Sequence, residues 1–296
     1  MADALLQAIV SGILTGATYA LVAMGIVIVY RSSGIFNFAH GAIILISAFL
    51  FWTLVSLAQW PLWGCVLVTL AAAYGIGSTI EFLAMRPLLG QPILPSIMMT
   101  LGLSMLFLGI YEVVWGHRGP VTFPEFMPMG HWKVGEIVIG QANTIVLGSA
   151  IVLLLLFNLF FRFTGTGKQV QAICEGHIIA QSVGIDVKRV LSFVWVIACV
   201  CAALAGVLVG ATGSVGIHLD ELVFMVIPVI ILGGLESMGG ALIAGFIVGL
   251  VEMISATFID PVIGGGFRQV APYLFLLIVL IVKPYGLFGW KRIERI

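Results

Sequence analysis

RFTGTGKQVQAICEGHIIAQSVGIDVKR, residues 162–189, is the longest charged interruption in an otherwise apolar sequence. Its charged residues are four bases and two acids: Arg162, Lys168, Lys188, Arg189, Glu175 and Asp186. Hydrocarbon leaves such polar groups unsatisfied, so this stretch must lie outside a membrane, between two apolar spans. Its excess of basic residues predicts the cytoplasmic side.

The composition of the whole chain is that of an integral membrane protein. Of the 296 residues, 61% are hydrophobic and 9% are charged, and the mean hydropathy is +1.20. A soluble domain has about 25% charged residues, so this chain has too little polar surface for a water-facing globule. We expect a single all-α transmembrane domain over residues 1–296. The formal net charge is zero, which gives no indication of a nucleic-acid partner.

The sequence has no pattern that is typical of an enzyme or a metal site. The four cysteines lack Cys-x-x-Cys spacing, and the five histidines are scattered over different segments. A Gly-rich phosphate-binding loop is also missing. We therefore expect a chain without catalytic residues, metal or cofactor of its own.

The apolar segments on both sides of residues 162–189 are long enough to cross a membrane, which takes about 20 helical residues. Residues 222–259 are too long for one crossing, and the sequence GGLESMGG at 233–240 interrupts them, so we expect two shorter helices there. The total is about eight or nine spans, with broken or re-entrant helices. The other expected spans are residues 4–30, 42–57, 62–84, 91–115, 144–161, 190–211 and 270–282.

The basic residues give a consistent orientation for these spans. If residues 162–189 are cytoplasmic, then Arg86 and Arg31 are also inside, and the N-terminus and a loop at about 116–143 are outside. A basic C-terminal tail ends the chain and belongs to the cytoplasm, provided that residues 222–259 cross twice or form a hairpin of equal parity. The bases of this tail are Lys283, Lys291, Arg292 and Arg295.

Two Gly-rich polar breaks lie on either side of residues 162–189, one at 37–41 and one at 233–240. Paired breaks in two groups of spans of similar size are typical of an inverted repeat around a central pathway. The candidate pathway residues in and near these breaks are Asn37, His40, Gly41, Gly234, Glu236 and Glu252.

Each polar candidate has a structural alternative. Polar groups inside a membrane usually face an interior cavity, yet Asn37 and His40 can equally satisfy a broken backbone and fix the start of a helix. Glu236 can cap the positive end of a half-helix, or that helix end can attract a substrate carboxylate. Glu252 can act as a gate or a protonated group, or it can pair with Arg268 or reach the outer interface.

Within the basic stretch, residues 169–183 show helical periodicity. Ile173, Gly176, Ala180 and Val183 fall on one stripe, and Gly184 follows as a C-cap. Such an amphipathic helix can lie on lipid headgroups or enter a groove on a partner protein, and periodicity does not choose between them.

Three motifs in order resemble one family, the permease subunits of bacterial ABC importers for branched-chain amino acids. The resemblance covers essentially the whole chain. The motifs are NFAHG at 37–41, LGGLESMGGA at 232–241 and KPYGLFG at 283–289.

The resemblance implies an ATPase-coupling loop at about 162–189. An acidic residue, small residues and a glycine form the coupling motif of these importers, and Glu175, Gly176, Ala180 and Gly184 match those positions. Gly176 and His177 stand where the family more often has two alanines. The family implies two ABC ATPase subunits that bind ATP and Mg, a second permease subunit or a second copy of this chain, and a periplasmic solute-binding protein.

The implied function is a multi-pass permease of the bacterial inner membrane that forms half of a translocation pathway in surrounding lipid. The implied cargo is branched-chain or other apolar amino acids, while relatives in the family carry urea, short amides or aromatic and organic acids. A different class of function, a stand-alone ion-coupled transporter or channel, would use Glu252, Glu236 or His40 for ion coupling.

Overall fold

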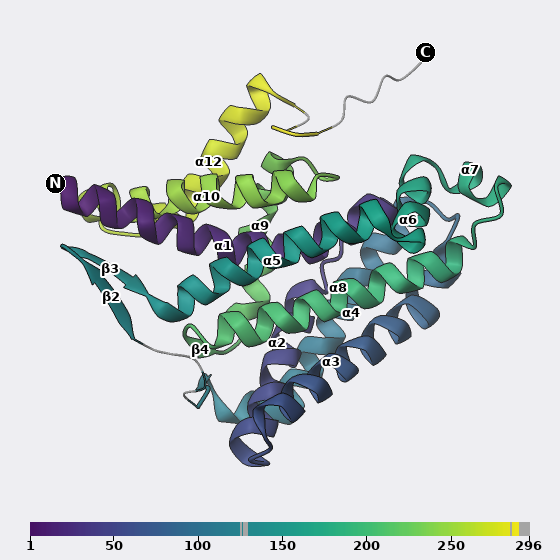
Figure 1. Cartoon of the computed structure of the whole chain (residues 1–296), viewed down its shortest axis with the longest axis horizontal. Helices are drawn as coiled ribbons and strands as arrows, with labels where there is room; N and C mark the ends of the chain where they lie inside the picture. Colours follow the sequence, from purple (N-terminus) through teal and green to yellow (C-terminus); the bar gives the residue numbers. More distant parts are fainter. Residues whose placement is uncertain (125, 127–129, 285, 290–296) are drawn as a thin grey trace. The chain divides into compact units, whose positions relative to one another are not determined.

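Helices dominate the computed structural model, which describes residues 1–124, 126, 130–284 and 286–289 (Figure 1). Seven helices in these residues are long and apolar enough to cross a membrane, which confirms the expected all-α multi-pass fold. They are α1 (Ala2–Ser33), α2 (His40–Trp52) with the π-helical turn η1 (Thr53–Leu57), α3 (Leu62–Thr79) with η2 (Ile80–Met85) and η3 (Arg86–Leu88), α4 (Ile93–Trp115), α5 (Gln141–Phe163), α8 (Val187–Gly210) and α10 (Met238–Phe258).

Shorter elements connect or follow these helices. Helices α9 and α10 are the two expected within residues 222–259, and the Gly-rich turn lies between them as predicted. The shorter elements are α6 (Gly165–Glu175), α7 (His177–Ser182), α9 (His218–Gly233), α11 (Asp260–Ile263), α12 (Phe267–Val282), the turn η4 (Gly116–Arg118) and the strands β1 (Val121–Thr122), β2 (His131–Val134), β3 (Ile137–Gly140) and β4 (Ser214–Val215).

The chain divides into two packing units. Unit 1 comprises Met1–Val27, Pro128–Leu154 and Phe224–Ile296, and unit 2 comprises Ile28–Met127 and Leu155–Val223. Helices α1, α5 and α9 each contribute residues to both units.

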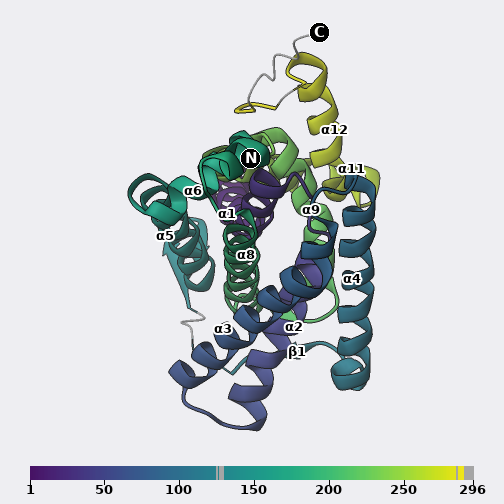
Figure 2. The same ribbon diagram turned by 90° about the vertical axis from the view of Figure 1, so that its right-hand side faces the viewer.

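The core of unit 2 is built on α2 and α8, whose side chains are mostly buried. Helix α3 packs along α8, and α2 packs against both of them (Figures 1 and 2). A Cβ on Gly77 of α3 would stand 2.7 Å from the Cα of Val196 in α8, so only a glycine permits this approach. The aromatic rings of Phe49, Tyr111 and Trp115 join α2 to α4.

The core of unit 1 is a close antiparallel pair, α1 and α10. Each helix carries a Gly-x-x-x-Gly motif, Gly12 to Gly16 and Gly245 to Gly249, and the two motifs face one another. A Cβ on Gly16 would stand 2.5 Å from the carbonyl oxygen of Gly245. Small residues at such positions let two membrane helices touch backbone to backbone.

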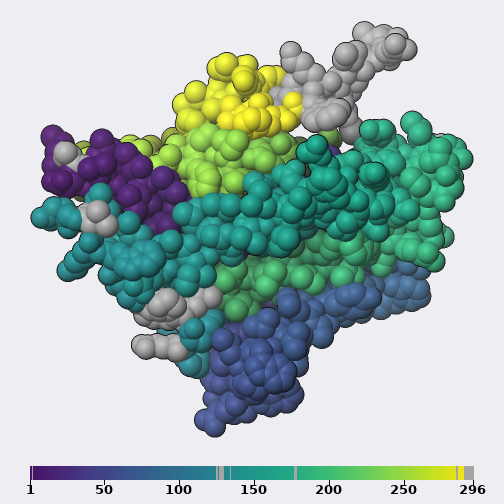
Figure 3. All heavy atoms as spheres, viewed as in Figure 1, coloured from purple at the N-terminus to yellow at the C-terminus, as the bar shows by residue number. Residues whose placement is uncertain are grey.

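Helix α5 has an exposed apolar face. Its outward face consists of large side chains that are about half exposed, and Figure 3 shows this helix in teal across one face of the molecule. A face of this composition suits acyl chains. Its residues include Val152, Leu155, Leu156 and Leu159.

The described residues of segment 116–143 contribute to two small antiparallel ribbons that the sequence did not predict. In unit 2, β1 pairs with β4, which joins this segment to the link between α8 and α9. In unit 1, β2 pairs with β3, and Gln7 of α1 exchanges two hydrogen bonds with the Val138 backbone, of 3.1 and 2.9 Å. The start of α1 and the β2–β3 ribbon therefore lie at the same end of unit 1.

The single helix predicted for residues 169–183 is wrong, and the predicted basic C-terminal tail lies mostly outside the described residues. Residues 169–183 do not form one helix, because Gly176 is extended and separates α6 from α7. Val183 is 71% exposed, whereas Ile173 and Ala180 are buried, so the expected single stripe does not share one environment. The bases of the C-terminal tail beyond Lys283 lie outside the described residues.

Candidate functional site

The basic stretch begins with a capped helix, α6. Thr164 is its N-cap: the hydroxyl oxygen accepts a hydrogen bond of 2.9 Å from the Gly167 amide and donates one of 2.7 Å to the Phe160 carbonyl. Val170 and Ile173 then face inward and are buried. Side-chain capping satisfies an amide that would otherwise lack a partner, and it fixes where α6 leaves α5.

Helix α7 ends in a Schellman motif centred on Gly184. The Gly184 residue adopts a left-handed φ of +84°, its amide donates to the Gln181 carbonyl at 3.0 Å, and the Ile185 amide donates to Ala180 at 3.0 Å. This pattern confirms the predicted C-cap. The Asp186 carboxylate then accepts from the Arg189 amide at 3.2 Å and caps α8.

The four predicted coupling residues do not share one environment. Glu175 and Gly184 are exposed, Gly176 is half-buried and Ala180 is buried. Ile179, which was not singled out, is 65% exposed, and Val183, which was expected on one stripe with Ile173 and Ala180, is 71% exposed. Ile179 and Val183 lie four residues apart around the end of α7, so they present one apolar face outside the spans.

The NFAHG motif at residues 37–41 forms the link between α1 and α2, and it is deeply buried in unit 2. Asn37 and His40 are each 0% exposed. The Asn37 Oδ1 atom accepts a hydrogen bond of 3.1 Å from the Ala39 amide. The Asn37 Nδ2 atom has no hydrogen-bond partner within the described residues. In this conformation the motif holds the backbone of a helix start and is not open to a solute.

Neighbouring helices clamp this motif. The Thr100 hydroxyl of α4 donates to the Phe36 carbonyl at 3.2 Å. Gly41 lies against the backbone of Asp220 in α9, and a Cβ there would overlap the Asp220 carbonyl. The glycine is therefore required by a close helix contact, and any larger residue would displace α9 from α2.

The second Gly-rich break, between α9 and α10, contacts the third family motif in unit 1. The Leu287 amide donates to the Leu232 carbonyl at 2.7 Å, and a Cβ on Gly234 would stand 2.6 Å from the Gly289 nitrogen. Two motifs whose first residues are 51 positions apart thus form one packed junction.

Glu236 is not the N-cap of α10. Ser237 has this position, and its hydroxyl oxygen accepts from the Gly240 amide at 3.0 Å. Glu236 lies one residue earlier, half-buried beside the positive helix end. The capping role that was considered for Glu236 is therefore taken by a shorter side chain that reaches the helix amides directly.

Glu252 meets Tyr19 and Met225 in the interior of unit 1. The Tyr19 hydroxyl donates to the Glu252 Oε2 atom at 2.5 Å and lies 3.9 Å from the Met225 sulfur. Tyr19 is buried and Glu252 is half-buried. Three helices, α1, α9 and α10, thus contribute a phenol, a thioether and a carboxylate to one cluster.

The antiparallel pairing of α1 and α10 explains why Tyr19 reaches Glu252. Helical side chains lean toward the N-terminus of their own helix, so these two side chains lean toward one another. Glu252 lies six residues, about 9 Å, before the end of α10, and its side chain leans further inward. The carboxylate therefore lies well inside the span, about 20 Å along α10 from the Gly-rich turn and not beside Glu236.

Sequence reasoning missed Tyr19, Met225, Ser237 and the apolar face of α7. A signal for Tyr19 existed, because Gly-x-x-x-Gly motifs in α1 and α10 predict that these two helices touch. Ser237 stands at a strong N-cap position just before an apolar helix. Nothing in periodicity indicated which side of α7 would be exposed.

Comparisons with known proteins agree with this architecture. The chain is 28% identical to the high-affinity branched-chain amino acid transport system permease protein LivH of Escherichia coli K12, over 98% of this chain and 97% of that protein. It is also 28% identical to the corresponding permease protein BraD of Pseudomonas aeruginosa, over 98% of each chain.

A solved structure shares the fold. PsaBC from Streptococcus pneumoniae in complex with Fab superposes with a TM-score of 0.51 over 95% of this chain and 92% of that chain, at 16% identity. The family model of branched-chain amino acid transport system permease components matches residues 8–283. This chain is a member of that family and is thus the membrane-spanning permease component of a transport system.

Proposed function

We propose that this chain is a permease subunit of an ATP-driven importer for branched-chain or other apolar amino acids. The observation that carries the coupling part of this proposal is the α6–α7 segment, which presents an apolar face beyond the ends of α5 and α8. The cargo is supported by LivH and BraD, whose names state branched-chain amino acid transport.

In the complete importer each of two permease subunits docks one of two ABC ATPases, which bind ATP and Mg, and this chain uses the face of α7 for it. Ile179 and Val183 enter the ATPase groove, Glu175 lies at its rim, and Gly176 and Gly184 set the ends of α7. Ala180 is buried and holds α7 against its own subunit. A second permease subunit, or a second copy of this chain, completes the pathway, and a periplasmic binding protein delivers the solute.

The N-terminus faces the periplasm and the α6–α7 segment faces the cytoplasm of the bacterial inner membrane. Basic residues gather at the α6–α7 end of unit 2, where Arg31 lies over the Phe161 ring and Arg86 approaches Lys188 across a groove. In unit 1, Gln7 joins the start of α1 to the β2–β3 ribbon. Positive charge on one side supports this orientation.

Glu252 faces the solute pathway and attracts the ammonium group of the amino acid as it crosses. An ionisable group inside a span normally faces a wet interior and not acyl chains, and Tyr19 holds this carboxylate in one orientation. Asn37, His40 and Gly41 act as a buried hinge between α1 and α2, while Gly234 and Glu236 shape the α9–α10 turn.

Reconstitution tests the proposal. Liposomes that contain this chain, its partner permease and the two ATPases should take up labelled leucine only when ATP, Mg and the binding protein are present. Urea, acetamide and benzoate should compete weakly. Uptake by this chain alone under an ion gradient would show a secondary transporter instead and would overturn the proposal.

A further inference from the structure

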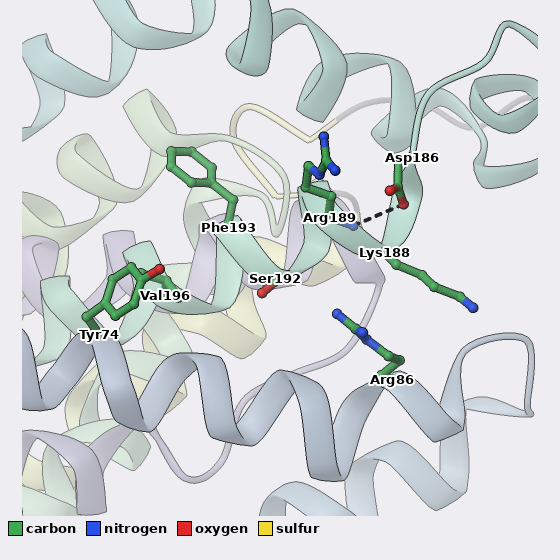
Figure 4. Close-up of a pocket in the computed structure, with 8 residues that line it drawn as sticks. All are labelled: Tyr74, Arg86, Asp186, Lys188, Arg189, Ser192, Phe193 and Val196. Carbon is green, nitrogen blue, oxygen red and sulfur yellow. Dashed lines mark hydrogen bonds between the residues drawn. The ribbon is translucent and has the colours of Figure 1, made fainter.

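A groove between α3 and α8 in unit 2 has no part in the transport function proposed above. Its cavity measures about 450 Å³, a size typical of sites for small ligands. Figure 4 shows Arg86 pointing from its helix toward Ser192 on α8, while Lys188 extends from the start of α8 away from the Arg86 guanidinium in this view. The mouth of the groove therefore lies at the end of unit 2 that carries α6 and α7.

The mouth carries a net positive charge. Arg86, Lys188 and Arg189 line it together with a single acidic residue, Asp186. Glu81 offsets part of this charge, because it accepts two hydrogen bonds from the Arg86 guanidinium at 3.1 and 3.0 Å. Three bases against two acids leave one positive charge in excess, and Lys188 extends freely enough to meet an anion.

The inner part of the groove is apolar. Tyr74, Phe193 and Val196 line it, and the backbones of α3 and α8 approach closely at Gly77 and Val196. Lys188 and Val196 are eight residues apart on α8, which corresponds to about 12 Å along the helix. This depth is close to half of a hydrocarbon core of about 30 Å, that is, one leaflet.

We propose that this groove binds one anionic phospholipid from the leaflet on the α6–α7 side. The phosphate lies between Lys188 and Arg86 and accepts a hydrogen bond from Ser192, while an acyl chain runs along Phe193 and Val196. Basic pockets between membrane helices recognise anionic headgroups in this way. A soluble phosphate ion would use the mouth alone and would leave the apolar wall uncovered.

The test is a titration of the assembled importer with phosphatidylglycerol, followed by native mass spectrometry. The wild type should bind one such lipid per copy of this chain more tightly than phosphatidylcholine. The variant Lys188→Gln/Arg189→Gln should bind it roughly thirtyfold more weakly, because each base near an anionic headgroup contributes about 1 kcal/mol. The control Arg162→Gln/Lys168→Gln removes two bases from the same segment but outside the groove, and it should bind normally.

Three outcomes would overturn the proposal: equal weakening in the control, equal affinity for phosphatidylcholine, or displacement of the lipid by millimolar inorganic phosphate. The last would identify a soluble anion as the ligand. If the double variant does not assemble, Lys188→Gln alone should weaken binding about fivefold. This assay involves no uptake, so its failure would leave the proposed transport function untouched.

Discussion

Tyr19 and Glu252 are joined by a hydrogen bond of 2.5 Å inside the antiparallel pair of α1 and α10. These residues are 233 positions apart in the chain, and each lies within a long apolar helix. The bond depends on the backbone contact between Gly16 and Gly245, which brings the two helices close enough for the side chains to meet. In unit 1 the Tyr19–Glu252 hydrogen bond therefore requires the close packing of α1 against α10.

The variant Tyr19→Phe removes the donor and leaves the Glu252 carboxylate half-buried without it. Hydrogen bonds between membrane helices contribute about 0.6 kcal/mol on average and up to about 1.7 kcal/mol, and a charged acceptor places this bond at the upper end. In thermal unfolding of the purified chain, the free energy of unfolding should fall by this amount in Tyr19→Phe and fall little further in Tyr19→Phe/Glu252→Gln. If the loss in the double variant equals the sum of the losses in the two single variants, a direct bond is contradicted.

The variant Glu252→Gln tests the proposed role in the pathway separately. It keeps the size of the side chain and an acceptor for Tyr19 but removes the negative charge. We expect KM for leucine uptake to rise about tenfold, which corresponds to 1.4 kcal/mol, with assembly unchanged. Glu112→Gln, at the exposed end of α4, is the matched control and should transport normally. Unchanged KM in Glu252→Gln would assign this carboxylate a structural role.

Substitution of Gly16 tests the helix contact. In Gly16→Ala the new Cβ would meet the Gly245 carbonyl at 2.5 Å, and such overpacking costs about 1–3 kcal/mol. Gly109→Ala in α4 is the control, since its Cβ would have open space around it and alanine favours a helix by about 1 kcal/mol. The free energy of unfolding should fall in Gly16→Ala and rise in Gly109→Ala. Equal changes in the two variants would contradict the α1–α10 contact.

Substitution of Gly184 tests the end of α7. A β-branched residue in the left-handed conformation at this position costs about 1–2 kcal/mol, so Gly184→Val should unwind the Schellman motif and shift the α7 face. Gly184→Asn should be tolerated, because asparagine adopts this conformation. We expect uptake and permease-stimulated ATP hydrolysis to fall strongly in the valine variant alone. Normal coupling in Gly184→Val would refute the role given to this turn.

The spans could be predicted because hydropathy and helix length are local properties. Residues 62–84 and 222–259 were placed correctly for this reason, including the break at the Gly-rich turn. The Gly184 cap was also predictable, because a glycine after a helical run has few other uses.

Other features depend on contacts that no local pattern contains. The helical periodicity of residues 169–183 continues across Gly176, yet packing of Ile173 and Ala180 against the subunit favours a break there. Tyr19 lies in a long and mostly apolar helix, so only the register of α1 against α10 identifies its partner. Strand β1 pairs with β4, a segment far along the chain, whereas β2 and β3 pair with each other in a local hairpin.

The central claim is that the apolar face of α7 holds the ATPase. Ile179→Asp places a charge on this face, whereas Gln181→Asp places the same charge on the same helix but about 200° around it from Ile179. Both residues are exposed, so neither change should affect folding of the permease.

The most direct measurement is the amount of ATPase subunit that co-purifies with each variant from solubilised membranes. We predict that Ile179→Asp loses most of the bound ATPase, since an apolar anchor at an interface contributes at least about 2 kcal/mol, and that Gln181→Asp retains it at the wild-type level. Full retention in Ile179→Asp, or equal loss in both variants, would contradict the account.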